Sequence, residues 1–272
     1  MYKKILIFMT VLLLGTTYVF ATDDIFNFDL GHFKVTAINI RSTNHNKTLF
    51  RHKDTKKLEQ FLNQKDSTAS AINVFYVDTG DHKILFDTGI SAKILVEKLK
   101  SINVDAKDID TVCITHMHYD HIAGLISDFN ETFRNAVVYI AQEESDVNKN
   151  SDILTLYSDR IKLFKQNEKI MSCIQTVPAF GHTAGHTMFV VTSQNNTLVV
   201  WGDIIHASIQ FEDPEICLTY DTDMEQALVV RKALLSQYAD SKEYIAGAHL
   251  LNCGVGKIKK DKDGYKFIFL KK

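Results

Sequence analysis

The sequence has 272 residues and a hydrophobic content of 45%, enough to form a full hydrophobic core in one large domain or a two-layer repeat. Its 31 Lys and Arg residues against 33 Asp and Glu residues give a formal net charge of −2, so charge indicates no nucleic-acid partner. The four cysteines have no C-x-x-C spacing and define no disulfide framework.

Residues 1–21 have the layout of a secretory signal peptide. Lysines at positions 3 and 4 precede an apolar run over 5–14, and Val19-Phe-Ala21 supplies a cleavage site. The run is too short for a comfortable transmembrane helix. We therefore expect a mature domain of residues 22–272 that is exported to the periplasm or secreted, without stable membrane association.

The first half of the chain shows strand and helix patterns in a clear order. We expect a strand over 31–40, a short helix over 56–62, a β-hairpin with arms at 71–77 and 83–86, and an amphipathic helix over 91–100. Two Asp-Thr-Gly triplets, at Asp78 and Asp87, invite an aspartic-protease interpretation. They lie nine residues apart on one hairpin and cannot face each other from two lobes, so we reject it.

A cluster of metal-ligand side chains follows the apolar run at 112–114, which is typical of a buried strand. Imidazole nitrogen and carboxylate oxygen are ligands that zinc prefers, and four such residues lie within six positions: His116, His118, Asp120 and His121. The first two histidines can point to one side as the chain leaves the strand. The other two residues lie one turn further on, so two metal ions are indicated.

Three downstream motifs repeat this signal, each at the end of an apolar run. They are Gly181-His-Thr-Ala-Gly-His186, Trp201-Gly-Asp203 and Ala246-Gly-Ala-His249. Ligands at strand ends converge on one edge of a sheet.

In the rest of the second half of the chain we expect a strand over 136–140, mixed helix and loop over 142–164, a hairpin over 187–201, a helix opened by a capping box at Thr222-Asp-Met-Glu225, and a final hairpin over 257–269.

The motif set resembles the metallo-β-lactamase superfamily. The resemblance implies that His116, His118 and His186 bind a first metal, that Asp120, His121 and His249 bind a second, and that Asp203 bridges them. It implies an α/β fold, an αβ/βα sandwich with two mixed sheets covered by helices and the metal site at one edge. Both ions are expected to be divalent, zinc above all, with manganese or iron as alternatives.

The resemblance also points to the methyl parathion hydrolase-like branch. It is carried by the segments 201–211, 231–235, 246–250, 254–258 and 264–267, which read WGDIIHASIQF, RKALL, AGAHL, GVGKI and GYKF. In such a protein Asp87 orients a ligand histidine from behind the metal loop. Asp120 and His206 are our candidate catalytic residues, since related lactonases place a tyrosine at the His206 position to hydrogen-bond the substrate carbonyl.

The implied reaction is hydrolysis of an ester, a lactone such as an acyl-homoserine lactone, or a phosphotriester in a small-molecule substrate. A hydroxide bridging two metals would be the nucleophile. A glyoxalase II-like thioesterase is disfavoured because only a short segment follows His249, and a β-lactamase because it does not normally combine His121 with Asp203. A non-catalytic metal-binding module is the alternative of another class. The sequence leaves open a homodimer.

Overall fold

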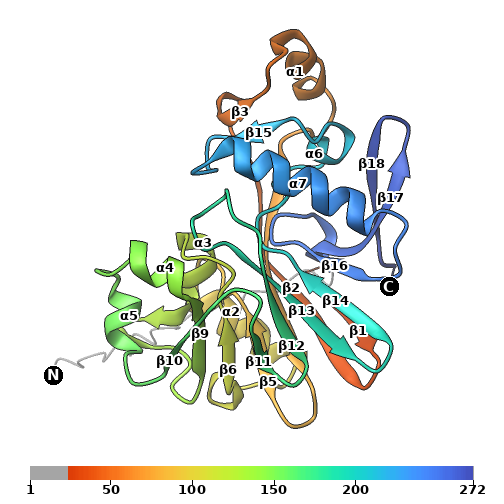
Figure 1. Cartoon of the computed structure of the whole chain (residues 1–272). Coiled ribbons are helices and arrows are strands. Elements are labelled where there is room, and N and C mark those ends of the chain that lie inside the picture. The colour runs from red at the N-terminus through yellow and green to blue at the C-terminus, as the bar shows by residue number, and fades with distance from the viewer. Residues whose placement is uncertain (1–23, 272) are drawn as a thin grey trace, which may run out of the picture.

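Two seven-stranded mixed sheets pack face to face in the computed structural model, which describes residues 24–271 (Figure 1). The expected signal peptide lies outside the described residues. In spatial order, the first sheet contains β1 (Ile25–Leu30), β2 (Phe33–Asn44), β4 (Ala69–Asp78), β5 (Lys83–Phe86), β6 (Thr111–Cys113), β9 (Val137–Ala141) and β10 (Ile161–Phe164). The strands from β5 to β10 run parallel, and the others pair antiparallel.

The second sheet is mainly antiparallel, with one parallel pair between β14 and β16. In spatial order it contains β11 (Lys169–Met171), β12 (Ile174–Pro178), β13 (Thr187–Ser193), β14 (Asn196–Val200), β16 (Tyr244–Ala246), β17 (Val255–Asp261) and β18 (Gly264–Phe269). Two small ribbons pair β3 (Phe50–Arg51) with β15 (Cys217–Leu218), and β7 (Ile126–Ser127) with β8 (Asn130–Glu131).

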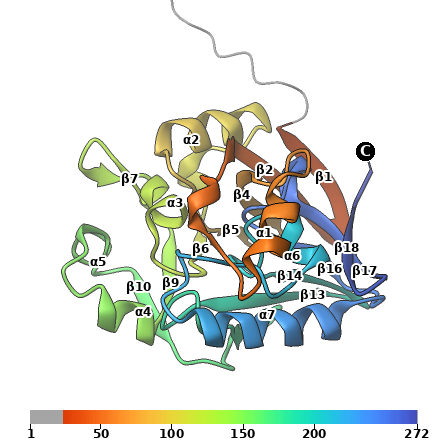
Figure 2. The ribbon, with the colours of Figure 1, turned by 90° about the horizontal axis from the view of Figure 1, so that it is seen from above.

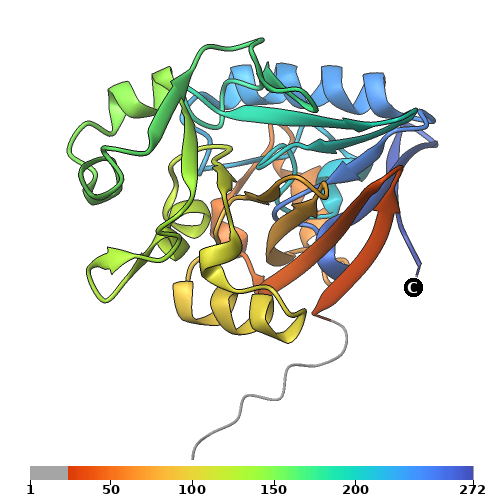
Figure 3. The same cartoon turned by 90° about the horizontal axis from the view of Figure 1, so that it is seen from below.

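The helices are α1 (Thr55–Leu62), α2 (Ala92–Ser101), α3 (Tyr119–Ile122), α4 (Gln142–Val147), α5 (Asp152–Leu156), α6 (Ile209–Glu212) and α7 (Met224–Tyr238). Of these, α2 packs on the outer face of the first sheet and α7 on the outer face of the second, whereas α1 packs against the ribbon of β3 and β15. The long helix α7 runs along the outside of the second sheet, and α2 lies on the opposite side of the molecule (Figure 3). This is the αβ/βα sandwich that the sequence predicts. Within residues 24–271, no helix combines the length and hydropathy that a membrane crossing requires.

The alternating direction of the side chains along the strands explains why each sheet packs on both of its faces. In β4, Val74 and Tyr76 pack toward α2, whereas Phe75 and Val77 pack between the sheets. Successive strand side chains point to opposite faces, so a strand covered on both sides is apolar throughout. On the outside of the second sheet, Leu235 of α7 packs in a separate apolar cluster with strand residues.

Some expected boundaries differ from the structure. The opening strand extends through Asn44 and pairs with an unpredicted first strand. The helix expected to open with a capping box from Thr222 is instead capped by Asp223, whose side chain accepts from the Gln226 backbone N–H. The segment expected to be mixed helix and loop also contains β10. These differences depend on pairing and capping geometry, which leave a weak local signal.

Candidate metal centre

The ligand-rich segments meet at the edge where four strands end. Asp87 follows β5, His116 lies three residues beyond β6, and Asp203 and His249 each lie three residues beyond their strands, β14 and β16. The two sheets are joined at this edge because the backbone N–H of Asn73 in β4 donates to Ala248 O at 2.8 Å. The convergence predicted from the strand ends is therefore present.

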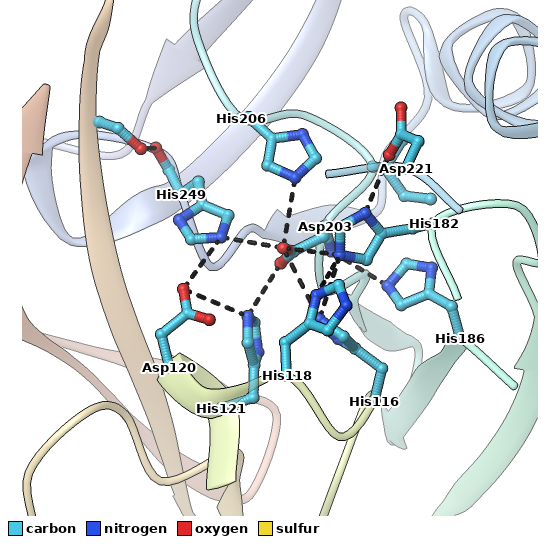
Figure 4. A network of polar contacts seen from close by, with 12 residues as sticks. His116, His118, Asp120, His121, His182, His186, Asp203, His206, Asp221 and His249 are labelled. Carbon is cyan, nitrogen blue, oxygen red and sulfur yellow. Dashed lines mark hydrogen bonds and ion pairs between the residues drawn. The ribbon is translucent and has the colours of Figure 1, made fainter. Parts of the chain in front are cut away.

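A first group of ligand-type side chains contains His116, His118, His182 and Asp203, whose ligand atoms all lie within 4.8 Å of one another. The His182 Nε2 atom lies 3.1 Å from His116 Nε2 and 3.0 Å from His118 Nδ1. It also lies 3.2 Å from Asp203 Oδ2. Figure 4 shows these four side chains pointing toward one another from three segments of the chain.

A second group contains Asp120, His121 and His249, with ligand atoms equally close. Asp203 lies between the two groups (Figure 4). Its Oδ1 is 3.2 Å from His121 Nε2, and its Oδ2 is 2.9 Å from His249 Nε2. The carboxylate that the sequence assigned as a bridge therefore faces both groups.

In three of the histidines, the ring nitrogen that faces away from the centre donates to an oxygen atom, and this hydrogen bond orients the ring. His121 Nδ1 donates to Asp87 Oδ2 at 2.8 Å, and His182 Nδ1 donates to Asp221 Oδ1 at 2.9 Å. His249 Nδ1 donates to the backbone oxygen of Ala71 at 2.8 Å. A proton held at Nδ1 leaves the Nε2 lone pair pointing inward, which is the arrangement that metal-binding histidines use. Asp87 lies where the sequence predicted it.

The donor set fits a divalent cation. The inward atoms His121 Nε2 and Asp203 Oδ1 are buried without a hydrogen-bond partner among the described residues. Leaving buried polar atoms unpaired costs on the order of 1–3 kcal/mol each. Imidazole nitrogens that face one another at about 3 Å are equally unfavourable unless a cation or a proton lies between them. An all-histidine and carboxylate set is typical of catalytic zinc rather than of sulfur-rich structural zinc.

Electrostatics keep the central carboxylate charged. Burial alone would raise the pKa of Asp203, but the surrounding histidines, His249 and His121 foremost, hold it well below its usual range. Burial opposes protonation of His182, yet Asp203 and Asp221 together raise its pKa to about 9. The centre is therefore a site of concentrated negative charge that attracts either protons or a cation.

The structure places His182 in the first group, and not His186, the ligand that the resemblance implied. Both ring nitrogens of His186 are already engaged: Nδ1 donates to Ala179 O at 2.9 Å, and Nε2 accepts from the Asp203 backbone N–H at 3.0 Å. Burial lowers its pKa to about 3, which keeps the ring neutral for this role. A Cβ at Gly202, where φ is +58°, would lie 2.4 Å from His186 Nε2, so glycine is needed there.

A sequence signal for His182 was available. Ligands were expected beyond strand ends, and His182 lies four residues after β12, whereas His186 directly precedes β13. A residue that enters a strand is fixed by the register of that strand, whereas a loop residue can turn toward the edge. The rule that identified the other ligands thus favours His182.

His206 is buried beside the centre, with 1% of its surface exposed. Its Nε2 lies 3.3 Å from Asp203 Oδ2, and its ring stacks on His249 at a centroid distance of 5.2 Å. Neither ring nitrogen has a hydrogen-bond partner within residues 24–271, and burial lowers the pKa of His206 to about 4. The side chain is therefore a neutral imidazole directed at the bridging carboxylate.

A cavity of about 450 Å³ opens onto the centre. Besides the metal-ligand side chains, its wall contains Thr43, Asn44, His45, Ile72, Tyr119 and Tyr220. His45 comes from the segment after β2 and donates from Nε2 to His206 O at 3.1 Å. In Figure 2 the segment after β2 and helix α1 lie in front of the sheets, between α3 and α6. His45 and Tyr220 were not predicted, because nothing local distinguishes them.

Residues 67–249 match the model of the Metallo-beta-lactamase superfamily, which covers more than half of the chain and the proposed ligand set. The chain belongs to the metallo-β-lactamase superfamily. Within that superfamily the fold is also that of the solved hydrolase AbOPH, with a TM-score of 0.84 and 23% identity over 91% of this chain and 98% of the other.

A second solved structure is AidC, a dizinc quorum-quenching lactonase, in complex with the product N-hexanoyl-L-homoserine. It has a TM-score of 0.83 and 25% identity over 91% of this chain and 97% of AidC. Among curated relatives, an exodeoxyribonuclease of Streptococcus pneumoniae, WalJ, is 41% identical over 59 residues. The chain spans only 22% of the length of WalJ.

Proposed function

We propose that the protein is an exported hydrolase that holds two divalent metal ions, zinc above all, and cleaves a lactone or another carboxylic ester. The observation that carries the proposal is a pair of ligand groups on either side of the Asp203 carboxylate, beside a cavity of about 450 Å³. When bound, the metal ions would supply an activated water and a Lewis acid for the substrate oxygen.

The chain itself supplies orientation and a hydrogen-bond donor. Tyr220 lies in the cavity wall with 41% of its surface exposed. Burial and the nearby Asp120 raise the pKa of Tyr220, so its phenol keeps its proton and can donate to a substrate oxygen. The His206 imidazole was proposed from the sequence for the same task. It does not line the cavity, so we propose that it acts on Asp203, with Tyr220 as the donor that meets the substrate.

Three observations favour a small ester substrate. The cavity has the size of a small-molecule site. Ile72 and the ring faces of Tyr119 and Tyr220 add apolar surface to its wall. The full-length similarity to a lactonase contrasts with the short match to a nuclease, and the net charge of −2 offers no footprint for nucleic acid. We place the protein in the methyl parathion hydrolase-like branch, with phosphotriester cleavage as a side reaction.

A substrate panel tests the reaction. Zinc-loaded and manganese-loaded protein would be assayed with acyl-homoserine lactones, aryl esters, phosphotriesters and a chromogenic cephalosporin. We expect the highest kcat/KM for a lactone or aryl ester. Metal binding without hydrolysis of any of them would favour the non-catalytic metal-binding module, and preference for the cephalosporin would favour a β-lactamase.

Export has a separate test. Protein recovered from the cell envelope or the medium should have an N-terminus at or near Thr22, because cleavage is expected after Ala21. Intact Met1 on protein from the cytoplasm would contradict it.

A further inference from the structure

Glu144 is a buried acidic residue that belongs to neither ligand group. It lies in α4 (Gln142–Val147) with 1% of its surface exposed. Its Oε2 accepts from the Met117 backbone N–H at 2.8 Å, and its Oε1 accepts from the Gly185 backbone N–H at 2.9 Å and from the Thr183 hydroxyl. A buried carboxyl group with three donors is well compensated for its loss of water.

The three donors come from the two loops that carry the histidines of the first group. Met117 stands between His116 and His118, and Thr183 directly follows His182. The two loops are about 65 positions apart in the sequence, yet His182 must come within 3.1 Å of His116. One carboxyl group therefore links the backbone of both loops at the position where their ligands have to meet.

The local sequence makes room for this contact. A Cβ at Gly185 would lie 2.7 Å from the Glu144 backbone nitrogen and 2.8 Å from its Cγ. Because a Cβ essentially never approaches backbone atoms so closely, the loop can reach Glu144 only with glycine at position 185. The second glycine of the Gly-His-Thr-Ala-Gly-His motif thus has a physical reason that the metal ligands do not provide.

We propose that Glu144 is a positioning residue that clamps the 116–118 loop to the 182–185 loop and so sets the geometry of the first metal site. The inference rests on the proposed metal centre, but not on any particular substrate. The side-chain hydrogen bonds of Glu144 go to the loops of the first group, whereas Asp87 and the Ala71 carbonyl orient His121 and His249 of the second group. The effect of losing the clamp should therefore fall on the first site.

The sharpest variant is Glu144→Gln, which keeps the size of the side chain. Whichever way the amide is turned, its NH₂ group faces at least one of the two backbone N–H donors, so one link between the loops is lost. We expect zinc affinity at one of the two sites to fall by about 10–100-fold, the range found for groups that orient metal ligands. Competition with a chelator measures it without any substrate, and the gain in Tm on adding zinc should shrink.

Thr176→Val is the matched control. The buried Thr176 hydroxyl binds the backbone of Glu168 at 2.9 Å, away from the ligand loops. This variant should lower the Tm of metal-free protein while leaving both zinc affinities unchanged. Gly185→Ala leaves Glu144 in place and should reproduce the loss of zinc affinity, so it serves as the second variant if Glu144→Gln does not fold.

The outcomes separate this inference from the proposed function. Wild-type zinc affinities in both Glu144→Gln and Gly185→Ala would overturn the clamp and leave the metal centre standing. Equal weakening of the two sites would also overturn it, because a general loss of stability would then explain the result. Wild-type protein that takes up no zinc would overturn the clamp and the proposed function together.

Discussion

The two ligand groups differ in how the fold holds them. The first group is assembled from loops far apart in the sequence, and Glu144 and Asp221 brace it from other elements. The second group draws two ligands from the short helix α3, and Asp120 keeps 30% of its side chain exposed. The difference indicates a first site that carboxylates from other elements hold in place, and a second site in which two of the ligands come from one short helix.

The largest effect should come from removing the carboxylate that the groups share. Asp203→Asn deletes the charge between His121, His182 and His249. We expect both metal occupancies to fall, and turnover to drop by more than about 100-fold, the upper range for groups that only orient ligands. Elemental analysis and a lactone assay measure the two effects. Two tightly held metals in this variant would contradict a shared role.

The next effect separates the two histidines of one loop. His182→Ala removes a side chain of the first group, so metal content should fall from about two toward one, and turnover by more than about 100-fold. His186→Ala is the matched control, since His186 only supports the Asp203 backbone. It should retain both metals and lose less activity. The reverse pattern would restore His186 as the ligand.

His206→Ala should have a somewhat smaller effect, on rate alone. Its imidazole lies beside Asp203 without belonging to the proposed ligand set. Because His206 is proposed to act on Asp203 and not on the substrate, we expect turnover to fall by about 10–100-fold, the range for groups that orient a metal ligand, with both metals retained. Tyr220→Phe, assayed under the same conditions, measures separately the contribution of the Tyr220 hydroxyl, the proposed donor in the cavity wall. Wild-type rates in His206→Ala would remove His206 from the mechanism.

The smallest effects should show the independence of the two groups. Asp87→Asn loosens His121, and Asp221→Asn loosens His182, so each should weaken one site by about 10–100-fold. Zinc titration would show one weakened site in each variant. If the double variant lost no more affinity than the worse single variant, the two groups would act as one unit.

Much of the fold and of the centre could be predicted from the sequence. Apolar strand runs and the H-x-H-x-D-H spacing are local signals, so the strands and the cluster of His116, His118, Asp120 and His121 were expected. The sandwich was implied by the resemblance that these motifs carry. The local pattern does not decide between His182 and His186 as ligands, because both fit the same motif. Their roles differ only through partners distant in the sequence, Asp221 for one and Ala179 O with the Asp203 N–H for the other.

The sequence by itself determined the chemistry of the centre, since ligand-type residues at strand ends reflect the side chains and the strand period. Only the tertiary structure decided how the centre is held and what it faces. The Glu144 clamp and the cavity wall at His45 and Tyr220 have no local signature. They arise because packing two sheets brings segments from distant parts of the chain to one edge, where hydrogen bonds and close contacts select the side chains that fit.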